Sequence, residues 1–425
     1  MAEQIRKRRI IAIAGGGIAG LTAALFLERA GFRVQVFEQA KKMQPEGAGI
    51  QLSPQAFKIL AHLGLDRSLR MAGQMPEGID IRSGKTGRHL TRFELGRTIL
   101  ERHGGPYLVI HRLDLANILL TACMDREDIE IIYDHKIADL AAHAHGVTLL
   151  AQTGGHFEEY QSSAFIAADG VWSSLRRFVH DAAQPAYTGR MAWRALFQMD
   201  GLPTDLPRDN TGLWIGPNAH LVHYPIRQGR IMNVVAITNA PFDEGAPPKR
   251  WQKDSPGTPR EDAFADWHPN IRELIFTKAK WGGWPLYAVD NAGRCANGPL
   301  CLIGDAAHAM EPYAAQGGAC AIEDAAQLAL LCKEIREDLP QAFATFCKMR
   351  RKRVNRILKL ARQNRAIYHM APPLSWARNA GMYFASQSTL QKRMDWLYGW
   401  EPKQPKPPID LTARVMRAAG SKSTS

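Results

Sequence analysis

Hydrophobic residues near the start of the chain follow the pattern of a strand, a helix and a second strand. Residues 9–14 form a short apolar run, residues 21–30 place apolar side chains at helical spacing, and residues 34–37 are apolar again. Gly31 follows the helical stretch directly, where a glycine commonly ends a helix. The pattern therefore predicts a β-α-β unit.

The middle of the chain instead has the shorter period of β-strands. Residues 78–92 contain short strand-like pieces, and residues 186–285 are rich in strands, Gly, Pro and Trp. Residues 219–226 and 231–237 flank a polar turn, which predicts a hairpin. Residues 299–366 return to strand, glycine-rich turn and long helix. The simplest account is an α/β domain that is interrupted by a β-sheet domain.

A glycine-rich turn joins the first strand to the helix. It consists of Gly15, Gly17, Ile18, Ala19 and Gly20, in the pattern G-x-G-x-x-G. The first glycine allows a tight turn, the second lets the backbone approach a pyrophosphate, and the third lets the helix pack closely on the strand. Glu38 ends the second strand, where an acid accepts hydrogen bonds from a ribose. We predict a dinucleotide site, and the alternative is a glycine-rich turn without a ligand.

Four further segments carry a family resemblance. They are Gly47-Ala-Gly49-Ile50, His111-Arg112-Leu-Asp114-Leu115, Ala168-Asp169-Gly170-Val-Trp-Ser-Ser-Leu-Arg176 and Leu302-Ile-Gly304-Asp305-Ala-Ala-His308. Together with the glycine motif they resemble the single-component FAD-dependent aromatic hydroxylases, of the type of salicylate hydroxylase, 3-hydroxybenzoate 6-hydroxylase and 6-hydroxynicotinate 3-monooxygenase. The resemblance runs from Arg9 to about Trp400.

The resemblance implies a Rossmann-like FAD-binding domain interrupted by a β-sheet substrate domain, with a C-terminal helical segment. We expect the FAD-binding domain in residues 1–75, 105–185 and 286–366, the substrate domain in 76–104 and 186–285, and the helical segment and tail in 367–425. The family pattern assigns Asp169, Asp305, Arg112 and Gly49 to the cofactor site, with Asp305 on the ribityl chain and Arg112 near the sugar-phosphate part. The alternatives are turn residues for the two aspartates and a surface ion pair for Arg112.

The resemblance also implies a reaction. NADH or NADPH would reduce FAD as a transient co-substrate, O2 would add to give a flavin hydroperoxide, and a phenolic or hydroxypyridine ring would be hydroxylated. No second G-x-G-x-x-G stands in a β-α-β setting, which fits a nicotinamide that only visits. The alternatives are an FAD-dependent reductase or dehydrogenase of the same fold and a non-catalytic flavin-binding regulator. The choice of nicotinamide, the substrate and any coupled decarboxylation stay open.

The segment after Asp305 is expected to lie beside the flavin ring. Gly317 and Gly318 open a helix whose N-terminus would stabilise negative charge on reduced flavin. In the family the proline of this loop lines the reaction pocket, and Pro312 matches it. Ala315 departs from the family's glycine, which leaves the backbone path there open. Glu311 stands where an apolar residue is common, and a solvent-facing position is the simple interpretation.

The predicted strand 219–226 carries the substrate-side candidates. Side chains alternate across a strand, so His220 and Tyr224 share one face and His223 points to the other. The resembling enzymes have His and Tyr at this spacing in the active site, and neutral imidazole suits removal of a phenolic proton. The alternative is a half-buried histidine and a core tyrosine.

Three other residue groups are expected to be structural first. The alternative for Arg194 is a partner for a substrate carboxylate. We assign most of Trp193, Trp214, Trp281 and Trp284 to the core, and we expect His308 to be a packed, hydrogen-bonded histidine.

The net charge of +13 comes from two places. One is the run 6–9, and the other is the stretch Lys348, Arg350, Arg351, Lys352, Arg353, Arg356, Lys359, Arg362 and Arg365. Because the rest of the chain balances, we expect no nucleic-acid partner. On a helix, Val354, Ile357, Leu358 and Ala361 form an apolar stripe, and the other side carries Arg351, Lys352, Arg356, Lys359 and Arg362. The basic side of this helix has three possible explanations: a solvated face, electrostatic attraction of NAD(P)H, and contact with a membrane surface. We favour the solvated face.

The N-terminal segment and the cysteines bear on the compartment in which the protein works. The basic and apolar N-terminus resembles a signal peptide, but it runs directly into the glycine motif, so we interpret it as a strand and expect a cytoplasmic protein. Six scattered cysteines without a C-x-x-C pair fit a reducing compartment and offer no metal site. We expect no membrane contact and either a monomer or a homodimer.

Overall fold

A six-stranded sheet carries the N-terminal motif. Its strand order is β17-β18-β11-β1-β2-β7, and all neighbours except β17 and β18 run parallel. The strands are β1 (Ile10–Ala14), β2 (Arg33–Glu38), β7 (Ile129–Tyr133), β11 (Ala164–Ala167), β17 (Ala296–Asn297) and β18 (Leu300–Leu302). The computed structural model describes residues 9–42, 49–179, 181–202, 206–240, 259, 261–276, 280–290 and 294–404. Arg6, Lys7 and Arg8, Gly47 and the tail beyond residue 404 lie outside the described residues.

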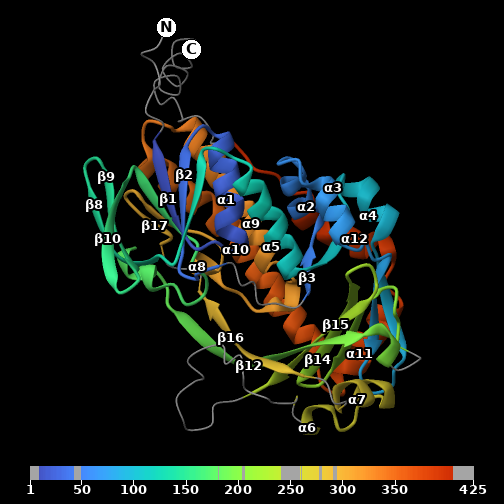
Figure 1. Ribbon diagram of the computed structural model, residues 1–425. Coiled ribbons are helices and arrows are strands. Elements are labelled where there is room, and N and C mark those ends of the chain that lie inside the picture. Colours follow the sequence, from blue (N-terminus) through green and yellow to red (C-terminus); the bar gives the residue numbers. More distant parts are fainter. Residues whose placement is uncertain are drawn as a thin grey trace, which may run out of the picture.

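Both faces of this sheet are covered, because its strands are apolar on both sides. Ile11 and Ile13 of β1 face the core with α1 (Ile18–Arg29) and α9 (Gly317–Glu334), which lie side by side (Figure 1). Ala12 and Ala14 face the other way, into a second core under the antiparallel sheet β10-β9-β8. These strands are β8 (Lys136–His143), β9 (Gly146–Thr153) and β10 (His156–Ser162). The predicted β-α-β unit is confirmed.

A seven-stranded sheet forms the second layer, with the order β16-β12-β15-β14-β13-β4-β5. All pairs are antiparallel except β13 with β4. The strands are β4 (Gly78–Ser83), β5 (His89–Glu94), β12 (Pro185–Gln198), β13 (Thr211–Gly216), β14 (Ala219–Ile226), β15 (Ile231–Asn239) and β16 (Gly282–Val289). The predicted hairpin is β14 with β15. The outer face of the seven-stranded sheet packs on α6 (Glu261–Phe264) and α7 (Pro269–Phe276). Trp214 and Trp281 are therefore core residues.

Smaller elements join the two layers. The strands β3 (Gly49–Leu52) and β6 (Leu108–His111) form a two-stranded sheet. The remaining helices are α2 (Pro54–Ala61), α3 (Asp66–Ala72), α4 (Gly96–His103), α5 (Arg112–Met124), α8 (Asp305–His308), α10 (Leu339–Tyr368), α11 (Leu374–Tyr383) and α12 (Gln387–Tyr398). The α/β class and the C-terminal helices are confirmed. The domain boundaries stay a proposal, with one refinement: β16 carries the seven-stranded sheet to Val289, past residue 285.

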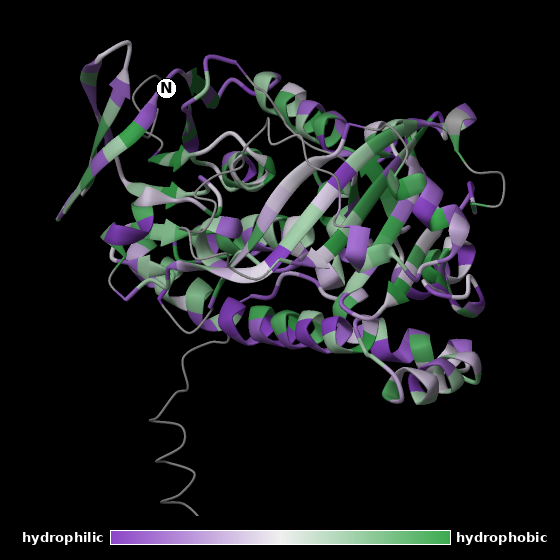
Figure 2. Ribbon diagram, turned by 90° about the horizontal axis from the view of Figure 1, so that it is seen from below, coloured by the Kyte–Doolittle hydropathy of each residue, from purple (hydrophilic) through white to green (hydrophobic). Residues whose placement is uncertain are grey.

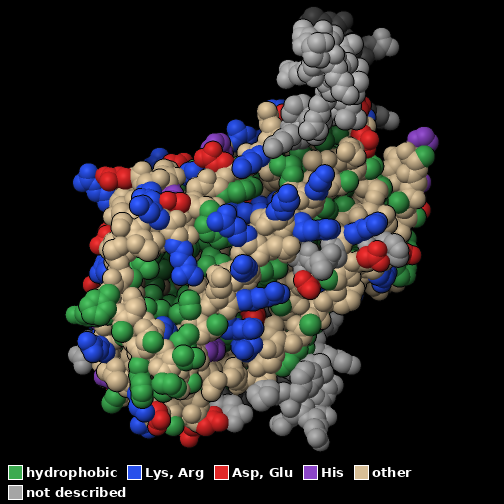
Figure 3. Space-filling view, turned by 180° about the vertical axis from the view of Figure 1, so that it is seen from behind, with side chains coloured by type: hydrophobic (Ala, Val, Ile, Leu, Met, Phe, Trp, Pro, Cys, Tyr) green, Lys and Arg blue, Asp and Glu red, His purple; other side chains and the backbone are tan. Residues whose placement is uncertain are grey.

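The long helix α10 runs along the back of the molecule. Its predicted apolar stripe is buried, and hydrophilic and hydrophobic positions alternate along it (Figure 2). Lys and Arg side chains form a band on this face (Figure 3), but the nine cations of the stretch are not equivalent. Arg350 and Arg353 are buried against Glu323 and Asp324 of α9, with ion-pair distances of 2.6–2.9 Å. The predicted solvated face therefore does not include these two cations, whose charges hold α10 to α9.

The cysteine pattern also needs a correction. Cys295 and Cys347 form a disulfide, although 52 residues separate them. Only the fold brings them together, so their spacing gave no sign of a pair. The cysteines therefore no longer support a reducing compartment. Among the described helices, none is long and apolar enough to cross a membrane.

Candidate active site

A cavity of about 750 Å³ lies between the two layers. It brings together residues from α1, β2, β3, α5, β14, α9 and the loops after β11 and β18. The predicted site residues that line it are Gly15, Gly17, Ile18, Ala19, Glu38, Gly49, Arg112, Asp169, His220, Tyr224, Asp305, Pro312, Gly317 and Gly318. Gly20 does not line it. A Cβ atom on Gly20 would lie 2.0 Å from the Gly15 carbonyl oxygen, so this glycine serves the packing of α1 on β1.

The N-terminus of α1 forms one end of the cavity. No side chain caps it, so its first N–H groups are free to bind an anion. A Cβ atom on Gly17 would meet nothing within 4 Å, because it would project into open space. Gly15 has φ of +101°, a conformation that glycine adopts without strain. This is the backbone shape that a pyrophosphate requires.

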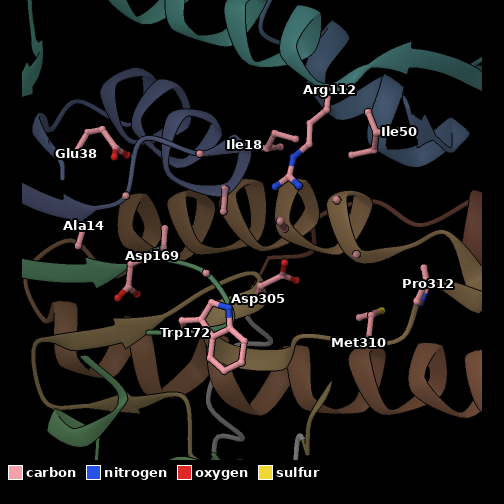
Figure 4. A pocket seen from close by; sticks show the side chains of 18 of the residues that line it. Ala14, Ile18, Glu38, Ile50, Arg112, Asp169, Trp172, Asp305, Met310 and Pro312 are labelled. Carbon is pink, nitrogen blue, oxygen red and sulfur yellow. The ribbon is translucent and has the colours of Figure 1, made fainter. Parts of the chain in front are cut away.

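Glu38 lies beside this turn at the end of β2. Its carboxylate accepts hydrogen bonds from the backbone N–H of Gly16 at 2.8 Å and of Ala40 at 2.9 Å. Figure 4 shows the side chain at one end of the cavity. The two backbone donors fix the carboxylate and leave acceptor capacity for ribose hydroxyls.

Two loops that carry the aspartates are tied together by Arg176. Its guanidinium is buried and donates to the carbonyl oxygens of Ala306 at 2.7 Å and Asp305 at 2.8 Å. Asp169 Oδ1 is buried and has no hydrogen-bond partner among the described residues, and burial raises the pKa of this carboxyl. An acceptor left in this way calls for a donor from a ligand.

Arg112 and the N-terminus of α9 complete the cofactor end. Arg112 extends from α5 into the cavity, and Asp305 lies across from it (Figure 4). No side chain caps α9, and a Cβ atom on Gly317 would project into open space. Ala315 adopts φ of +51°, so the backbone takes a left-handed path despite the missing glycine. Two uncapped helix ends, a carboxylate with one unpartnered oxygen and an arginine fit the pyrophosphate, hydroxyl groups and flavin ring of FAD.

His220 and Tyr224 lie at the other end, on one face of β14. Both line the cavity, and burial raises the pKa of Tyr224 and lowers that of His220 well below its ordinary value. His223 points to the opposite face, as predicted, and burial lowers its pKa to about 3. Gly49 permits the close approach of Tyr224, since a Cβ atom there would lie 2.4 Å from the tyrosine ring.

The sequence did not point to His369, which follows α10. Its Nε2 lies 2.9 Å from Nδ1 of His220, although 149 residues separate the two. The rings of Tyr313 and Tyr368 also pack on His220, with centroid distances of 5.0 and 5.4 Å. A lone histidine after a long helix has no spacing signal that could have revealed this contact.

Arg194 belongs to the cavity as well, which its structural assignment did not anticipate. Its Nε is buried without a hydrogen-bond partner among the described residues, and its guanidinium lies 5.3 Å from the Trp284 ring centre. Burial, together with the charge of Arg112, lowers its pKa to about 10. Trp172 lines the cavity (Figure 4), whereas Trp193 and Trp284 pack against core clusters.

Two expectations about neighbouring residues have opposite outcomes. Glu311 does not face solvent: it pairs with Arg190 at 3.4 Å and Arg365 at 2.9 Å and is largely buried. Its charge is needed because two cations meet there. His308 is a packed histidine, as predicted, and its Nε2 lies 2.6 Å from Asp324. Burial alone would lower its pKa, but Asp324 raises it overall.

Comparisons with known proteins agree with this arrangement. The FAD binding domain family matches residues 9–361. The 3-hydroxybenzoate 6-hydroxylase of Polaromonas naphthalenivorans is 33% identical over 393 residues, which covers 92% of this chain and 96% of the relative. The 6-hydroxynicotinate 3-monooxygenase of Bordetella bronchiseptica is 32% identical over 355 residues, with coverages of 83% and 91%.

Solved structures share the fold. Klebsiella pneumoniae HpxO complexed with FAD and uric acid superposes with a TM-score of 0.78 at 24% identity, over 91% of this chain and 95% of that one. The predicted resemblance is confirmed by the relatives that carry the names of aromatic hydroxylases and monooxygenases. The chain belongs to the FAD binding domain family.

Proposed function

We propose that this protein uses FAD, NADH or NADPH and O2 to hydroxylate a small phenolic or hydroxypyridine acid. The observation that carries the proposal is the placement of His220 and Tyr224 in the same cavity as the dinucleotide motif and the N-terminus of α9. The relatives act on hydroxybenzoate and hydroxynicotinate according to their names, and His220 and Tyr224 would supply the acid–base groups for such rings.

The residues at the cofactor end would hold FAD. The N-terminus of α1 with Gly15 and Gly17 would receive the pyrophosphate, and Glu38 the ribose hydroxyls. Arg112 and Asp305 would meet the phosphate and ribityl groups. Bound FAD would supply hydride acceptance from NAD(P)H and activation of O2, with one oxygen atom going to the ring and the other to water.

His220 is the group that we assign to proton removal from the substrate. Since burial lowers its pKa, the imidazole is neutral near pH 7 and can accept a proton. Removing the phenolic proton increases electron density in the ring, which favours attack on an electrophilic oxygen. The Tyr224 hydroxyl keeps its own proton, because burial raises its pKa, and can donate a hydrogen bond to the substrate oxygen.

Pro312 and the N-terminus of α9 would shape the reaction pocket. Pro312 lines the cavity beside Met310, on the loop that leads into α9. The free N–H groups at the N-terminus of α9 would stabilise negative charge on a flavin ring bound there. Arg194 supplies a cation that a carboxylate on the substrate could meet.

Three accompanying statements are part of the proposal. The nicotinamide visits the flavin without a lasting site of its own. The protein works in the cytoplasm as a monomer or homodimer, which light scattering distinguishes. The chain divides into the FAD-binding and substrate domains at the boundaries given above, with the refinement at Val289.

The test combines oxygen uptake with product mass. Protein loaded with FAD is mixed with NADH or NADPH and a panel of hydroxybenzoates and hydroxynicotinates. We expect one compound to accelerate flavin reduction and to yield a product heavier by one oxygen atom. Oxygen consumed only to peroxide across the panel contradicts hydroxylation. Oxidation of a substrate without O2 would instead indicate a dehydrogenase, and no reduction with any ligand a regulator.

A further inference from the structure

His220 has no direct exit for the proton that it would take from a substrate. Its side chain is only 2% exposed, and the cavity would be filled by cofactor and substrate during the reaction. His369 is half-buried, so it has contact with solvent. The two rings meet through His220 Nδ1 and His369 Nε2 at 2.9 Å.

The contact links the tautomer of His220 to that of His369. At 2.9 Å exactly one of the facing nitrogens donates and the other accepts. If His220 is to accept a substrate proton at Nε2, that atom must be unprotonated and Nδ1 must carry the hydrogen. His369 Nε2 is then the acceptor, and His369 holds its own proton at Nδ1.

We propose that His369 is a positioning residue that fixes this tautomer of His220 and relays the substrate proton to solvent. The substrate O–H bond breaks as an N–H bond forms at His220 Nε2. The Nδ1–H bond of His220 then breaks as an N–H bond forms at His369 Nε2. His369 finally releases a proton from Nδ1 to water. The reverse steps return a proton from water to the ring oxygen of the product when the ring regains its aromaticity, and this restores the starting tautomers of both histidines. This inference rests on the proposed function of His220.

The charged residues around the two histidines favour transfer of the proton to solvent and disfavour a lasting positive charge on either imidazole. Arg190 of β12 and Arg365 of α10 lie near the histidine pair, and both form an ion pair with Glu311. Burial, together with the charges of these two arginines, lowers the pKa of His369 to about 4. The other titratable neighbours, Tyr313 and Tyr368, have raised pKa values because of burial and stay neutral. An imidazolium at either position is therefore short-lived near pH 7.

Two substitutions separate positioning from relay. In His369→Gln the amide oxygen can still accept from His220 Nδ1 but cannot pass a proton on. In His369→Leu both functions are lost. His143→Gln, at an exposed position of β8, is the matched control. The visible spectrum of bound FAD shows that each variant is folded.

The first readout is the tautomer, which needs no substrate. In FAD-loaded protein with ¹⁵N-labelled histidine, we expect His220 to carry its proton on Nδ1 in the wild type and in His369→Gln, and to show mixed tautomers in His369→Leu. A proton on Nε2 in the wild type would overturn the proposal. Because this measurement is independent of turnover, it remains decisive even if hydroxylation of the panel fails.

The second readout is proton release, followed with a pH-indicator dye in stopped flow. The probe is whichever panel compound the wild type hydroxylates. We expect His369→Gln to bind it with unchanged affinity but to release the proton, and to form product, about tenfold to a hundredfold more slowly. His143→Gln should match the wild type. Wild-type rates of release in His369→Gln would overturn the relay.

Discussion

The two ends of the cavity are lined by different kinds of chemical group. The end that we assign to FAD is made of main-chain groups, with two uncapped helix N-termini and glycines whose missing side chains leave space. The end that we assign to the substrate is made of buried side chains, namely His220, Tyr224 and Arg194, whose pKa values are all shifted by burial. Cofactor binding should therefore fail when atoms are added to the backbone turn, and the reaction should fail when atoms are removed from side chains.

Substitutions of two glycines test the first half of this contrast and should have the largest effect. In Gly20→Ala the new Cβ would lie 2.0 Å from the backbone oxygen of Gly15, so we expect a loss of more than about 3 kcal/mol in the free energy of unfolding and no bound FAD. Gly17→Ala has room in the fold but not against a pyrophosphate, so the protein should fold and bind FAD about tenfold to a hundredfold more weakly. Thermal unfolding and FAD fluorescence separate the two results. A Gly20→Ala protein with normal melting temperature and FAD content would contradict the packing role.

The second prediction removes a side chain at the substrate end. His220→Ala should retain FAD, because no cofactor group is touched, and should hydroxylate about 10²- to 10⁴-fold more slowly, since the base is gone. The FAD spectrum and product formation are measured on the same sample, with His143→Gln as the control. Full activity in His220→Ala would show that the ring is deprotonated elsewhere, and lost FAD would show that the two ends are not separate.

The third prediction concerns charge at the substrate end. Arg194→Met should raise the KM for a carboxylated substrate about tenfold to a hundredfold, because a charge-assisted hydrogen bond is lost, and should leave the KM for the matching carboxamide unchanged. Arg97→Met is the control, since the side chain of Arg97 is 88% exposed on α4. An equal rise for acid and amide would indicate that Arg194 shapes the pocket without pairing with the carboxylate.

The same contrast explains what the sequence could reveal. The glycine motif, Glu38 and the Gly317 helix end are contiguous segments whose backbone course is their function, so a short pattern predicted them. His220 and Tyr224 were accessible because they share one strand. The sequence could not reveal the roles of His369 and Arg194 or the ion pairs of Glu311. These arise only where β12, β14 and the end of α10 meet. The disulfide and the buried Arg350 likewise depend on contacts between distant segments.

We expect the smallest effect on activity from the exposed charges on α10. Solvent screens these charges, whereas the buried charges are not screened. Arg350 and Arg353 are paired with acids of α9, and Arg365 is paired with Glu311. The candidates for electrostatic steering are therefore the exposed cations. Reversing Lys352, Lys359 and Arg362 to Glu should slow flavin reduction by NAD(P)H about two- to fivefold at low salt, and the difference should vanish near 1 M salt, where the Debye length is about 3 Å. Stopped-flow reduction across a salt series measures this effect. Equal rates at every ionic strength would leave these lysines and arginines as a solvated face, and charge would then matter in this protein only where burial has removed water from around it.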